Sequence, residues 1–292
     1  MGPNPSRQTR SEQREATREK ARALREANAR KERTKSVTLR VSLVVGILAA
    51  VSLIVVAIVS GINQQAATQA GPANMLYDNG IKIGADLQAY TKTQTPAPKP
   101  AASSATGASV PNIVIYLDYQ CPICQTFEQG NAAQLRQWVK SGVATIEFHP
   151  MSFLDGRGSP NTYSSRAANA ALCVANYSPD QFFDFSSLLF AHQPAEGTPG
   201  PENPVLIQRT TQVGVQNAGK IADCINNKTF GKWMENTTNT VLGSGYTVKG
   251  TDIKVTGTPT IVVNGKQYAW TTQPELVSPA RFAAWFQQAI KG

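Results

Sequence analysis

Cys121 and Cys124 are the two residues of this chain whose type and spacing best suit chemistry. They follow an apolar run at 113–117 and open a helical segment that Gly142 closes, so the pair is expected where a strand gives way to a helix. Pro122 suits the first turn, because its missing N–H group would have no partner there. The helix N-terminus stabilises a thiolate at Cys121, and Cys124 lies within disulfide reach. A thiolate that attacks and a second thiol that resolves the mixed disulfide are the two groups that thiol–disulfide exchange requires.

A structural zinc site is the main alternative for this pair. Zinc ribbons need a second close pair of cysteines or a Cys/His couple. Cys173 and Cys224 are isolated in the sequence, and His149 and His192 lack the spacing of a zinc finger. We therefore expect no metal site and no cofactor.

Residues 41–62 carry no charge and are dominated by Val, Ile, Leu and Ala. As a helix this segment is about 33 Å long, enough to cross a bilayer core, so we expect one transmembrane helix. A cleaved signal peptide, with a cleavage site at 66–70, is the alternative, but it would have a shorter apolar core and a short basic leader. All four cysteines follow this segment.

Residues 1–40 form a basic tail with twelve Lys/Arg against five Glu, which is +7 of the formal net charge of +9. By the positive-inside rule the tail stays in the cytoplasm, and the chain after residue 62 lies outside the cell membrane, where disulfides persist. Leu24 is almost the only large apolar residue between 11 and 35, which fits neither a coiled coil nor a DNA-reading domain. We expect a topology signal beside anionic lipid and no nucleic-acid partner.

Residues 63–109 are expected to form a tether. Asn79-Gly80 between short apolar runs predicts a β-hairpin at 75–84, and the Pro-, Ala- and Ser-rich stretch that follows predicts an extended linker. The folded domain then spans 110–292, which is long enough to bury one substantial core.

The order of elements in this domain indicates the fold class. A strand at 112–117, the helix from Pro122 and a strand at 144–148 form a βαβ unit, and a hairpin at 260–270 and a helix at 279–290, capped by Ser278, end the chain. Between the halves lies a helical block at about 160–245, with helices at 162–177, 179–192, 204–213, 218–226 and 230–242. The sequence thus predicts an α/β protein: a thioredoxin fold with an inserted helical domain, preceded by a single transmembrane helix.

The stretch 114–127, the segment 255–265 and the helical insertion together resemble the DsbA-like thiol–disulfide oxidoreductases. The run 163–171 and the pair Cys173/Cys224 are similar to the membrane-anchored DsbA-like proteins of actinobacteria. The likeness covers about residues 75–290, and the order and separation of the motifs make it more specific than either motif alone.

The resemblance implies a role for each matching residue. Cys121 would be the exposed nucleophile and Cys124 the buried resolving thiol, with Pro122 and Ile123 between them helping to set the stability of the thiolate. Thr258 and Pro259 match the cis-proline element of the family, which faces the cysteine pair. The backbone of Thr258 would there hold a client peptide as an added strand.

One departure from the family concerns a buried acid that assists proton transfer from the resolving thiol. This chain has Ile115 at that position, six residues before Cys121. Asp118 and Glu147 are candidates to replace the acid, although Asp118 is equally explained as a solvated turn residue. His149 is a candidate to tune the Cys121 thiolate, or a structural histidine beside a proline.

Cys173 and Cys224 are expected to form a structural disulfide, because they lie on different predicted helices of an extracytoplasmic domain. Closing a loop of this length contributes about 4 kcal/mol to the free energy of unfolding. The alternative is a second redox pair.

Together these features predict a single-pass membrane protein that exchanges disulfides with secreted or cell-envelope proteins, as their oxidant. The resemblance further implies reoxidation by a quinone-linked membrane partner, such as a vitamin K epoxide reductase homologue. Pro122-Ile123 differs from the Gly-Pro of reducing thioredoxins and from the Pro-His of the strongest oxidants, so an extracytoplasmic reductase is the alternative. A copper-binding assembly factor on the same fold is the alternative from another class.

Overall fold

The computed structural model describes residues 18, 20, 22, 70–75, 79–91 and 110–291. The chain divides into two units, residues 1–64 and 65–292, and the second contains the folded domain. In the described residues no helix is both long enough and apolar enough to span a membrane. The predicted transmembrane helix at 41–62 and most of the basic tail and linker lie outside them.

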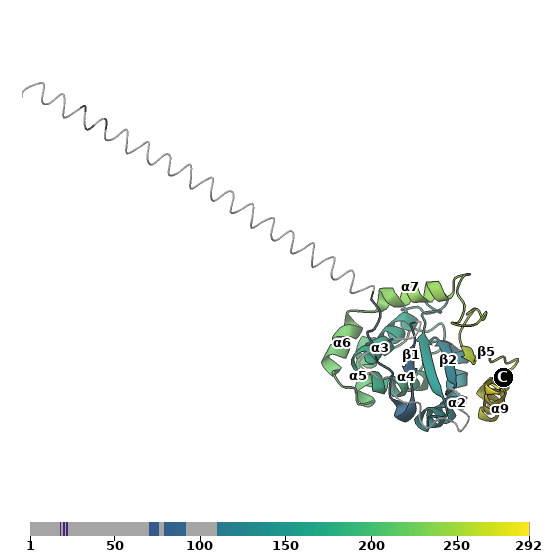
Figure 1. Ribbon diagram of the computed structural model, residues 1–292. Coiled ribbons are helices and arrows are strands. Elements are labelled where there is room, and N and C mark those ends of the chain that lie inside the picture. Colours follow the sequence, from purple (N-terminus) through teal and green to yellow (C-terminus); the bar gives the residue numbers. More distant parts are fainter. Residues whose placement is uncertain are drawn as a thin grey trace, which may run out of the picture. The chain divides into compact units, whose positions relative to one another are not determined.

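In the described part of the chain, the centre of the domain is a five-stranded sheet with the order β1-β3-β2-β4-β5. Its strands are β1 (Ile81–Ile83), β2 (Asn112–Leu117), β3 (Thr145–Pro150), β4 (Thr260–Val263) and β5 (Lys266–Gln267). β2 and β3 run parallel and are connected by α2 (Pro122–Lys140), whereas the other neighbours pair antiparallel. Figure 1 labels β1, β2, β5 and α2. This arrangement confirms the predicted thioredoxin core.

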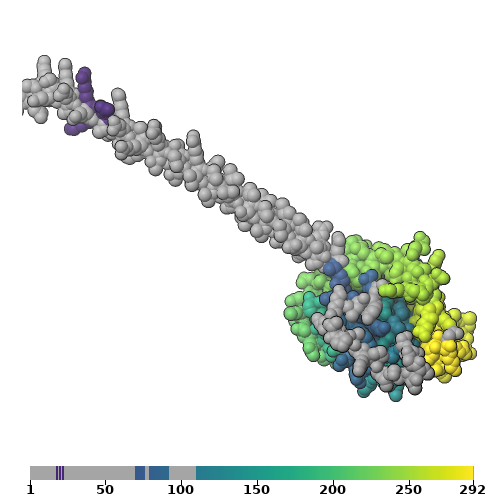
Figure 2. Space-filling model, in the orientation of Figure 1, coloured from purple at the N-terminus to yellow at the C-terminus, as the bar shows by residue number. Residues whose placement is uncertain are grey.

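The helical insertion lies between β3 and β4, as predicted. It contains α3 (Tyr163–Tyr177), the 3-10 turn η2 (Pro179–Gln181), α4 (Phe182–Ala191), α5 (Asn203–Gln212), α6 (Ala218–Asn226) and α7 (Gly231–Val241). After β5 come α8 (Gln273–Val277), which was not predicted, and α9 (Pro279–Ile290), whose cap Ser278 accepts the Arg281 N–H group. The insertion, largely green, and the yellow C-terminal segment occupy different parts of the face in Figure 2.

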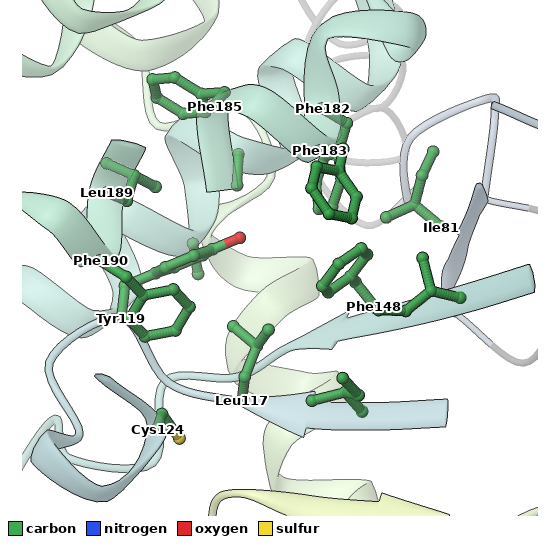
Figure 3. Close-up of a cluster of buried hydrophobic side chains, with 14 of the residues drawn as sticks. Ile81, Leu117, Tyr119, Cys124, Phe148, Phe182, Phe183, Phe185, Leu189 and Phe190 are labelled. Carbon is green, nitrogen blue, oxygen red and sulfur yellow. The ribbon is translucent and has the colours of Figure 1, made fainter. Parts of the chain in front are cut away.

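The main core covers one face of the sheet, into which the side chains of Ile113, Ile115 and Leu117 of β2 point. Helices α2, α4 and α9 contribute most of its aromatic side chains, among them Phe127, Phe182, Phe183, Phe282 and Phe286. Figure 3 shows Phe182 and Phe183 of α4 beside Phe148 of β3. Their ring centroids lie 5.6 and 5.8 Å from the centroid of the Phe148 ring.

A smaller core covers the opposite face of the sheet. Tyr116 of β2 and Val262 of β4 pack there against Val241, Val248 and Val255, which come from the end of α7 and the segment after it. Because side chains alternate along a strand, β2 presents even-numbered residues to this core and odd-numbered residues to the main one.

β1, the second strand of the hairpin expected at 75–84, extends the sheet at its edge by pairing with β3. Ile81 and Ile83 are fully buried and pair with Phe148 and Ile146 of β3, while Ile83 also bridges to Ala89. Residues 76–78, in the other expected strand, lie outside the described residues. The apolar alternation identified the strand, but its partner is distant in sequence.

The predicted disulfide between Cys173 of α3 and Cys224 of α6 is present. Both residues are buried, at 0% and 3% exposure, in the interior of the insertion. The bond therefore closes a loop within the insertion and holds two of its helices together, away from the cysteine pair of α2.

Replacing both Cys173 and Cys224 with alanine is expected to lower the free energy of unfolding by about 4 kcal/mol and the melting temperature by about 10 °C. The redox potential of Cys121/Cys124 should stay unchanged, because the two pairs lie on separate elements. Thermal unfolding and equilibration with glutathione measure the two quantities. A potential shifted by more than about 30 mV would mean that the pairs are coupled.

Candidate active site

The strand-to-helix junction places the cysteine pair as predicted. Cys121 is the N-cap residue of α2, and Pro122 and Ile123 form the first turn. The Cys121 sulfur accepts the Cys124 N–H group at 3.4 Å, and the Cys121 N–H group donates to the Asp118 carbonyl at 3.1 Å. The nucleophile candidate is therefore held by the free N–H groups of a helix N-terminus.

Thr258 and Pro259 reach the pair from the far end of the sequence. β4 pairs antiparallel with β2, with Thr260 opposite Tyr116. The residues just before β4 therefore lie at the same end of the sheet as residues 118–124, which we call the catalytic turn. The Thr258–Pro259 peptide bond is cis. The Cys121 thiol donates to the Thr258 carbonyl at 3.3 Å, and Pro259 lines a small cavity with the second cysteine.

Cys121 is buried, which corrects the expectation of an exposed nucleophile. The exposed fraction is 5% for Cys121 and 3% for Cys124. The N-cap geometry turns the Cys121 sulfur inward, onto the Cys124 N–H group and the Thr258 carbonyl, while Pro122 stays on the surface. The two thiols therefore do not differ in solvent accessibility, and only a difference between their pKa values can make one of them the nucleophile.

The environments of the two sulfurs push their pKa values apart. The Cys124 thiol donates to the Cys121 sulfur and, against desolvation, lowers the pKa of Cys121 to about 7, with further help from Thr258 and the backbone N–H groups of the first turn. Burial first, and then the neighbouring Cys121, raises the pKa of Cys124 well above its ordinary value. Near neutral pH one sulfur is thus a nucleophile and the other a protonated thiol.

The reduced protein is expected to show one thiolate transition with a midpoint near pH 7, because the pKa of Cys121 is lowered to about 7. Alkylation by iodoacetamide should modify Cys121 faster as pH rises through 7, while Cys124 stays unmodified. Thiolate absorbance and mass spectrometry of the alkylated peptides measure these quantities. Equal alkylation rates at the two cysteines would contradict the assignment.

Asp118 is fully buried, so its explanation as a solvated turn residue is wrong. Its carboxylate accepts the Gln120 N–H group at 2.8 Å, the Leu154 N–H group at 2.9 Å and the Ser164 hydroxyl at 2.7 Å. Burial raises the pKa of Asp118 to about 6, and these hydrogen bonds oppose the rise. One carboxylate therefore ties the catalytic turn to the loop after β3 and to α3.

Glu147 and His149 lie on the wrong face of the sheet to serve Cys121, which corrects two further candidates. They are opposite Val114 and Tyr116 in the parallel pairing of β2 and β3. His149 stacks on Tyr116 with ring centroids 4.3 Å apart and pairs with Glu147 at 2.9 Å. Burial is the largest influence and opposes ionisation of Glu147, but the hydrogen bonds from His149 and Asn112 and the nearby positive charges together outweigh it, so the pKa of Glu147 is lowered.

Glu128, a buried acid one helical turn after Cys124, was missed by sequence reasoning. Its carboxylate accepts the Ser187 hydroxyl of α4 at 2.6 Å, and burial raises its pKa. Glu128 and Cys124 line a cavity of about 10 Å³, room for about one water molecule, and Ile115 lines it too. Glu128 of α2 thus lines the same cavity as Ile115, the position at which related proteins carry the buried acid. The i,i+4 spacing from Cys124 was the available signal.

Two glutamine side chains bind the catalytic turn to the loop after α4. Gln193 Nε2 donates to the Cys121 carbonyl at 3.0 Å. Gln120 Nε2 donates to the carbonyls of Ala195 and Thr198 at 3.3 and 2.9 Å. The insertion therefore supports the backbone on both sides of the nucleophile, and no local pattern in the sequence indicated these contacts.

Comparison with known proteins agrees with this geometry. Residues 105–280 match a protein family described as thioredoxin. The chain is similar to the reduced disulfide bond oxidoreductase DsbG of Mycobacterium tuberculosis, with 27% identity and a TM-score of 0.54 over 75% of this chain and 90% of that chain. For reduced DsbA of the same organism, the identity is 27% and the TM-score 0.52, over 73% of this chain and 93% of that chain.

Two further comparisons define the limits of the likeness. BdbD of Bacillus subtilis, in its oxidised form, shares the fold with 19% identity and a TM-score of 0.51, over 76% of this chain and 99% of that chain. No curated protein matches. Because the family match covers more than half of the sequence, the chain belongs to the thioredoxin family, as a DsbA-like thiol–disulfide oxidoreductase.

Proposed function

We propose that this protein is a membrane-anchored oxidase that forms disulfides in secreted and cell-envelope proteins. The asymmetry of the cysteine pair carries the proposal: the pKa of Cys121 is lowered to about 7, whereas that of Cys124 is raised well above its ordinary value. Stabilising the Cys121 thiolate stabilises the reduced pair. It therefore favours transfer of the disulfide from the enzyme to a client.

The size of this effect sets the expected redox potential. One pKa unit is about 1.4 kcal/mol, or about 30 mV for a two-electron couple. The strongest oxidants of this type combine a thiol pKa of about 3.5 with a potential of about −120 mV. Since the pKa of Cys121 is about 7, the potential should lie about 100 mV lower, near −220 mV.

A potential near −220 mV still supports oxidation of clients. Structural disulfides of secreted proteins have potentials below about −300 mV. Transfer of a disulfide to such a client is therefore favourable by about 4 kcal/mol. The enzyme needs a partner that keeps it oxidised, and it does not need the potential of the strongest oxidants.

The exchange proceeds through Cys121. A client thiolate attacks the Cys121 sulfur of the oxidised pair, a client–Cys121 bond forms, and Cys124 leaves with the electron pair and takes up a proton. A second client thiolate then attacks the client sulfur of this mixed disulfide and releases the Cys121 thiolate. The client is oxidised by two electrons, and the enzyme pair is reduced by two.

The backbone of Thr258 supplies the surface on which a client peptide adds as a strand. Its carbonyl lies 3.3 Å from the Cys121 sulfur, and Thr258 is only partly buried. In the oxidised pair Cys121 carries no proton, so this carbonyl is free to accept a client N–H group, and the client is held with its cysteine against the Cys121 sulfur.

Anchoring and reoxidation complete the proposal. The uncharged segment 41–62 would hold the domain at the outer surface of the cell membrane, with the basic tail in the cytoplasm. A membrane partner in the same plane, such as a quinone-linked vitamin K epoxide reductase homologue, would accept the two electrons of the reduced pair.

Equilibration of the purified domain with glutathione tests the direction of transfer. We expect a potential near −220 mV and catalysed refolding of a reduced, disulfide-containing test protein. A potential at or below about −270 mV without oxidation of the test protein would instead support a reductase. The lowered pKa of Cys121, about 7, is also the value of thioredoxin, which makes the reductase the second candidate.

Glu128 accepts the proton of Cys124 in the proposed mechanism. During reoxidation Cys121 is in a mixed disulfide with the partner, and Cys124 must lose its proton before it attacks. Its raised pKa makes the free thiolate rare. A water molecule in the 10 Å³ cavity would link the thiol to the Glu128 carboxylate.

Glu128→Gln is expected to slow the attack of Cys124 on a Cys121–glutathione mixed disulfide by roughly 10- to 100-fold at neutral pH, the scale of general base catalysis. Rapid mixing of the preformed mixed disulfide measures this step. The loss should shrink as pH rises, because hydroxide replaces the carboxylate. Glu235→Gln, on the surface of α7, is the matched control. Unchanged resolution in Glu128→Gln would contradict the role.

A further inference from the structure

The loop after β3 brings Phe153 next to the residues on which a client is proposed to bind. A Cβ atom built on Gly257 would lie 3.9 Å from the tip of the Phe153 ring. Gly257 immediately precedes Thr258, whose carbonyl contacts the Cys121 sulfur. Because residue 257 has no side chain, the half-buried ring borders the client surface directly.

Arg157 places a positive charge on this ring. Its guanidinium carbon lies 4.7 Å from the centroid of the Phe153 ring, the geometry of a cation–π contact. Arg157 is exposed, and it has no ion-pair partner among the residues that the structure describes. Arg157 and Phe153 thus form a cationic and aromatic pair beside Gly257, which we name the Phe153/Arg157 subsite.

The position of the subsite relative to Cys121 is fixed by one carboxylate. Asp118 accepts the N–H group of Leu154, the neighbour of Phe153, and also the N–H group of Gln120, the neighbour of Cys121. The Arg157 N–H group in turn donates to the Leu154 carbonyl at 2.9 Å. The loop is therefore bonded to the same buried group as the catalytic turn.

Two acids lie near the subsite. Asp155 accepts the Ser165 N–H group of α3 at 3.2 Å, so one of its oxygens is bonded to α3. The Glu196 side chain lies 3.9 Å from the place of a Cβ atom on Gly158. Arg157 is nevertheless the charged group stacked on the ring that faces Gly257.

We propose that the Phe153/Arg157 subsite selects clients with an acidic side chain close to the reacting cysteine. The inference rests on the proposed function, since it assumes that a client strand runs along Thr258. The guanidinium pairs with the client carboxylate, and the Phe153 ring packs against its methylene groups. Phe153 lies to one side of the Thr258–Pro259 turn, so the preference should concern residues on one side of the client cysteine only.

A set of short peptides tests the proposal. Each contains one cysteine, with Glu, Gln or Lys placed within two residues of it on the N-terminal or the C-terminal side. The rate of mixed-disulfide formation with the oxidised, purified protein is divided by the uncatalysed rate with oxidised glutathione, which corrects for the intrinsic reactivity of each thiol. We expect Glu to exceed Lys by about fivefold on one side of the cysteine, mainly through KM, and the difference to disappear at high salt.

Variants assign the preference to the subsite. Arg157→Gln should abolish the Glu/Lys difference while the redox potential and the Cys121 titration remain those of the wild type, and Arg157→Glu should invert the preference. Arg281→Gln, which removes the same charge from α9, is the matched control and should retain the preference. Phe153→Leu removes the ring on which Arg157 stacks and should therefore reduce the Glu/Lys difference.

Two negative results are distinguishable. Equal rates with all the peptides, or a Glu preference that survives Arg157→Gln, would overturn the subsite and leave the oxidoreductase function intact. Failure to exchange with every peptide, together with normal exchange with glutathione, would instead overturn the proposed client surface.

Discussion

Cys121→Ser should reduce catalysed disulfide exchange by at least roughly 10³-fold, to the rate without enzyme, because it removes the only sulfur of lowered pKa in the catalytic pair. Oxidation of a monothiol peptide and refolding of a reduced test protein measure this loss. The variant should remain folded, since a hydroxyl at the N-cap position accepts the same backbone N–H group.

Cys124→Ser should give a different result. Its Cys121 still attacks disulfides, but the mixed disulfide cannot be resolved within the enzyme, so covalent complexes accumulate. They are visible on gels without reductant and identify clients by mass spectrometry. The Cys173→Ala/Cys224→Ala protein is the control and should form no such complexes. If Cys121→Ser instead formed covalent client complexes through Cys124, as fast as Cys124→Ser forms them through Cys121, the assigned roles of the two cysteines would be reversed.

Local features of the sequence were sufficient to predict the junction at Cys121. The apolar run of β2, Pro122 in the first turn and Gly142 after the helix all act over a few residues, and the structure reproduces them. The predicted order of strands and helices also holds, because the length and periodicity of each segment are local properties.

The supporting residues depend on tertiary contacts and were harder to predict. Glu147 and His149 are candidates from the sequence because they lie near the end of the strand next to β2. The period of two along β3 puts them on the face opposite Phe148, which packs in the main core. Glu128 was missed although α2 carries it to the same cavity as Cys124. The alternation of side chains along β3 and the four-residue spacing from Cys124 along α2, applied together, would have excluded Glu147 from the site and included Glu128.

Asp118→Ala is expected to lower the free energy of unfolding by roughly 5 kcal/mol, because the buried N–H groups of Gln120 and Leu154 lose their acceptor and a cavity is left. The same variant should slow exchange, since both the catalytic turn and the loop of Phe153 lose their common support. Denaturant unfolding of the reduced protein measures the stability. Asp252→Ala, on the surface, is the control and should change stability by less than about 0.5 kcal/mol.

The pH dependence of stability separates the charge of Asp118 from its hydrogen bonds. Burial raises the pKa of Asp118 from 3.8 to about 6. A carboxyl group whose pKa is higher in the folded than in the unfolded protein stabilises the fold fully when the pH is below its pKa in the unfolded protein. This stabilisation is lost as the pH rises through its pKa in the folded protein. Two pKa units correspond to about 3 kcal/mol, so wild-type stability should fall by about this amount between pH 4 and pH 7.

Glu128, whose pKa burial also raises, contributes a fall of the same sign that both proteins share. Asp118→Ala should lack the part of the fall that comes from Asp118, which makes its deficit relative to wild type larger at pH 4.5 than at pH 7. Glu147 does not mask the effect: its pKa is lowered from 4.5, so its contribution is lost only as pH drops below that value. Unfolding curves at half-unit steps from pH 4 to pH 7 compare the two proteins. A deficit that is constant over this range would mean that Asp118 is ionised throughout, and that its three hydrogen bonds outweigh its burial.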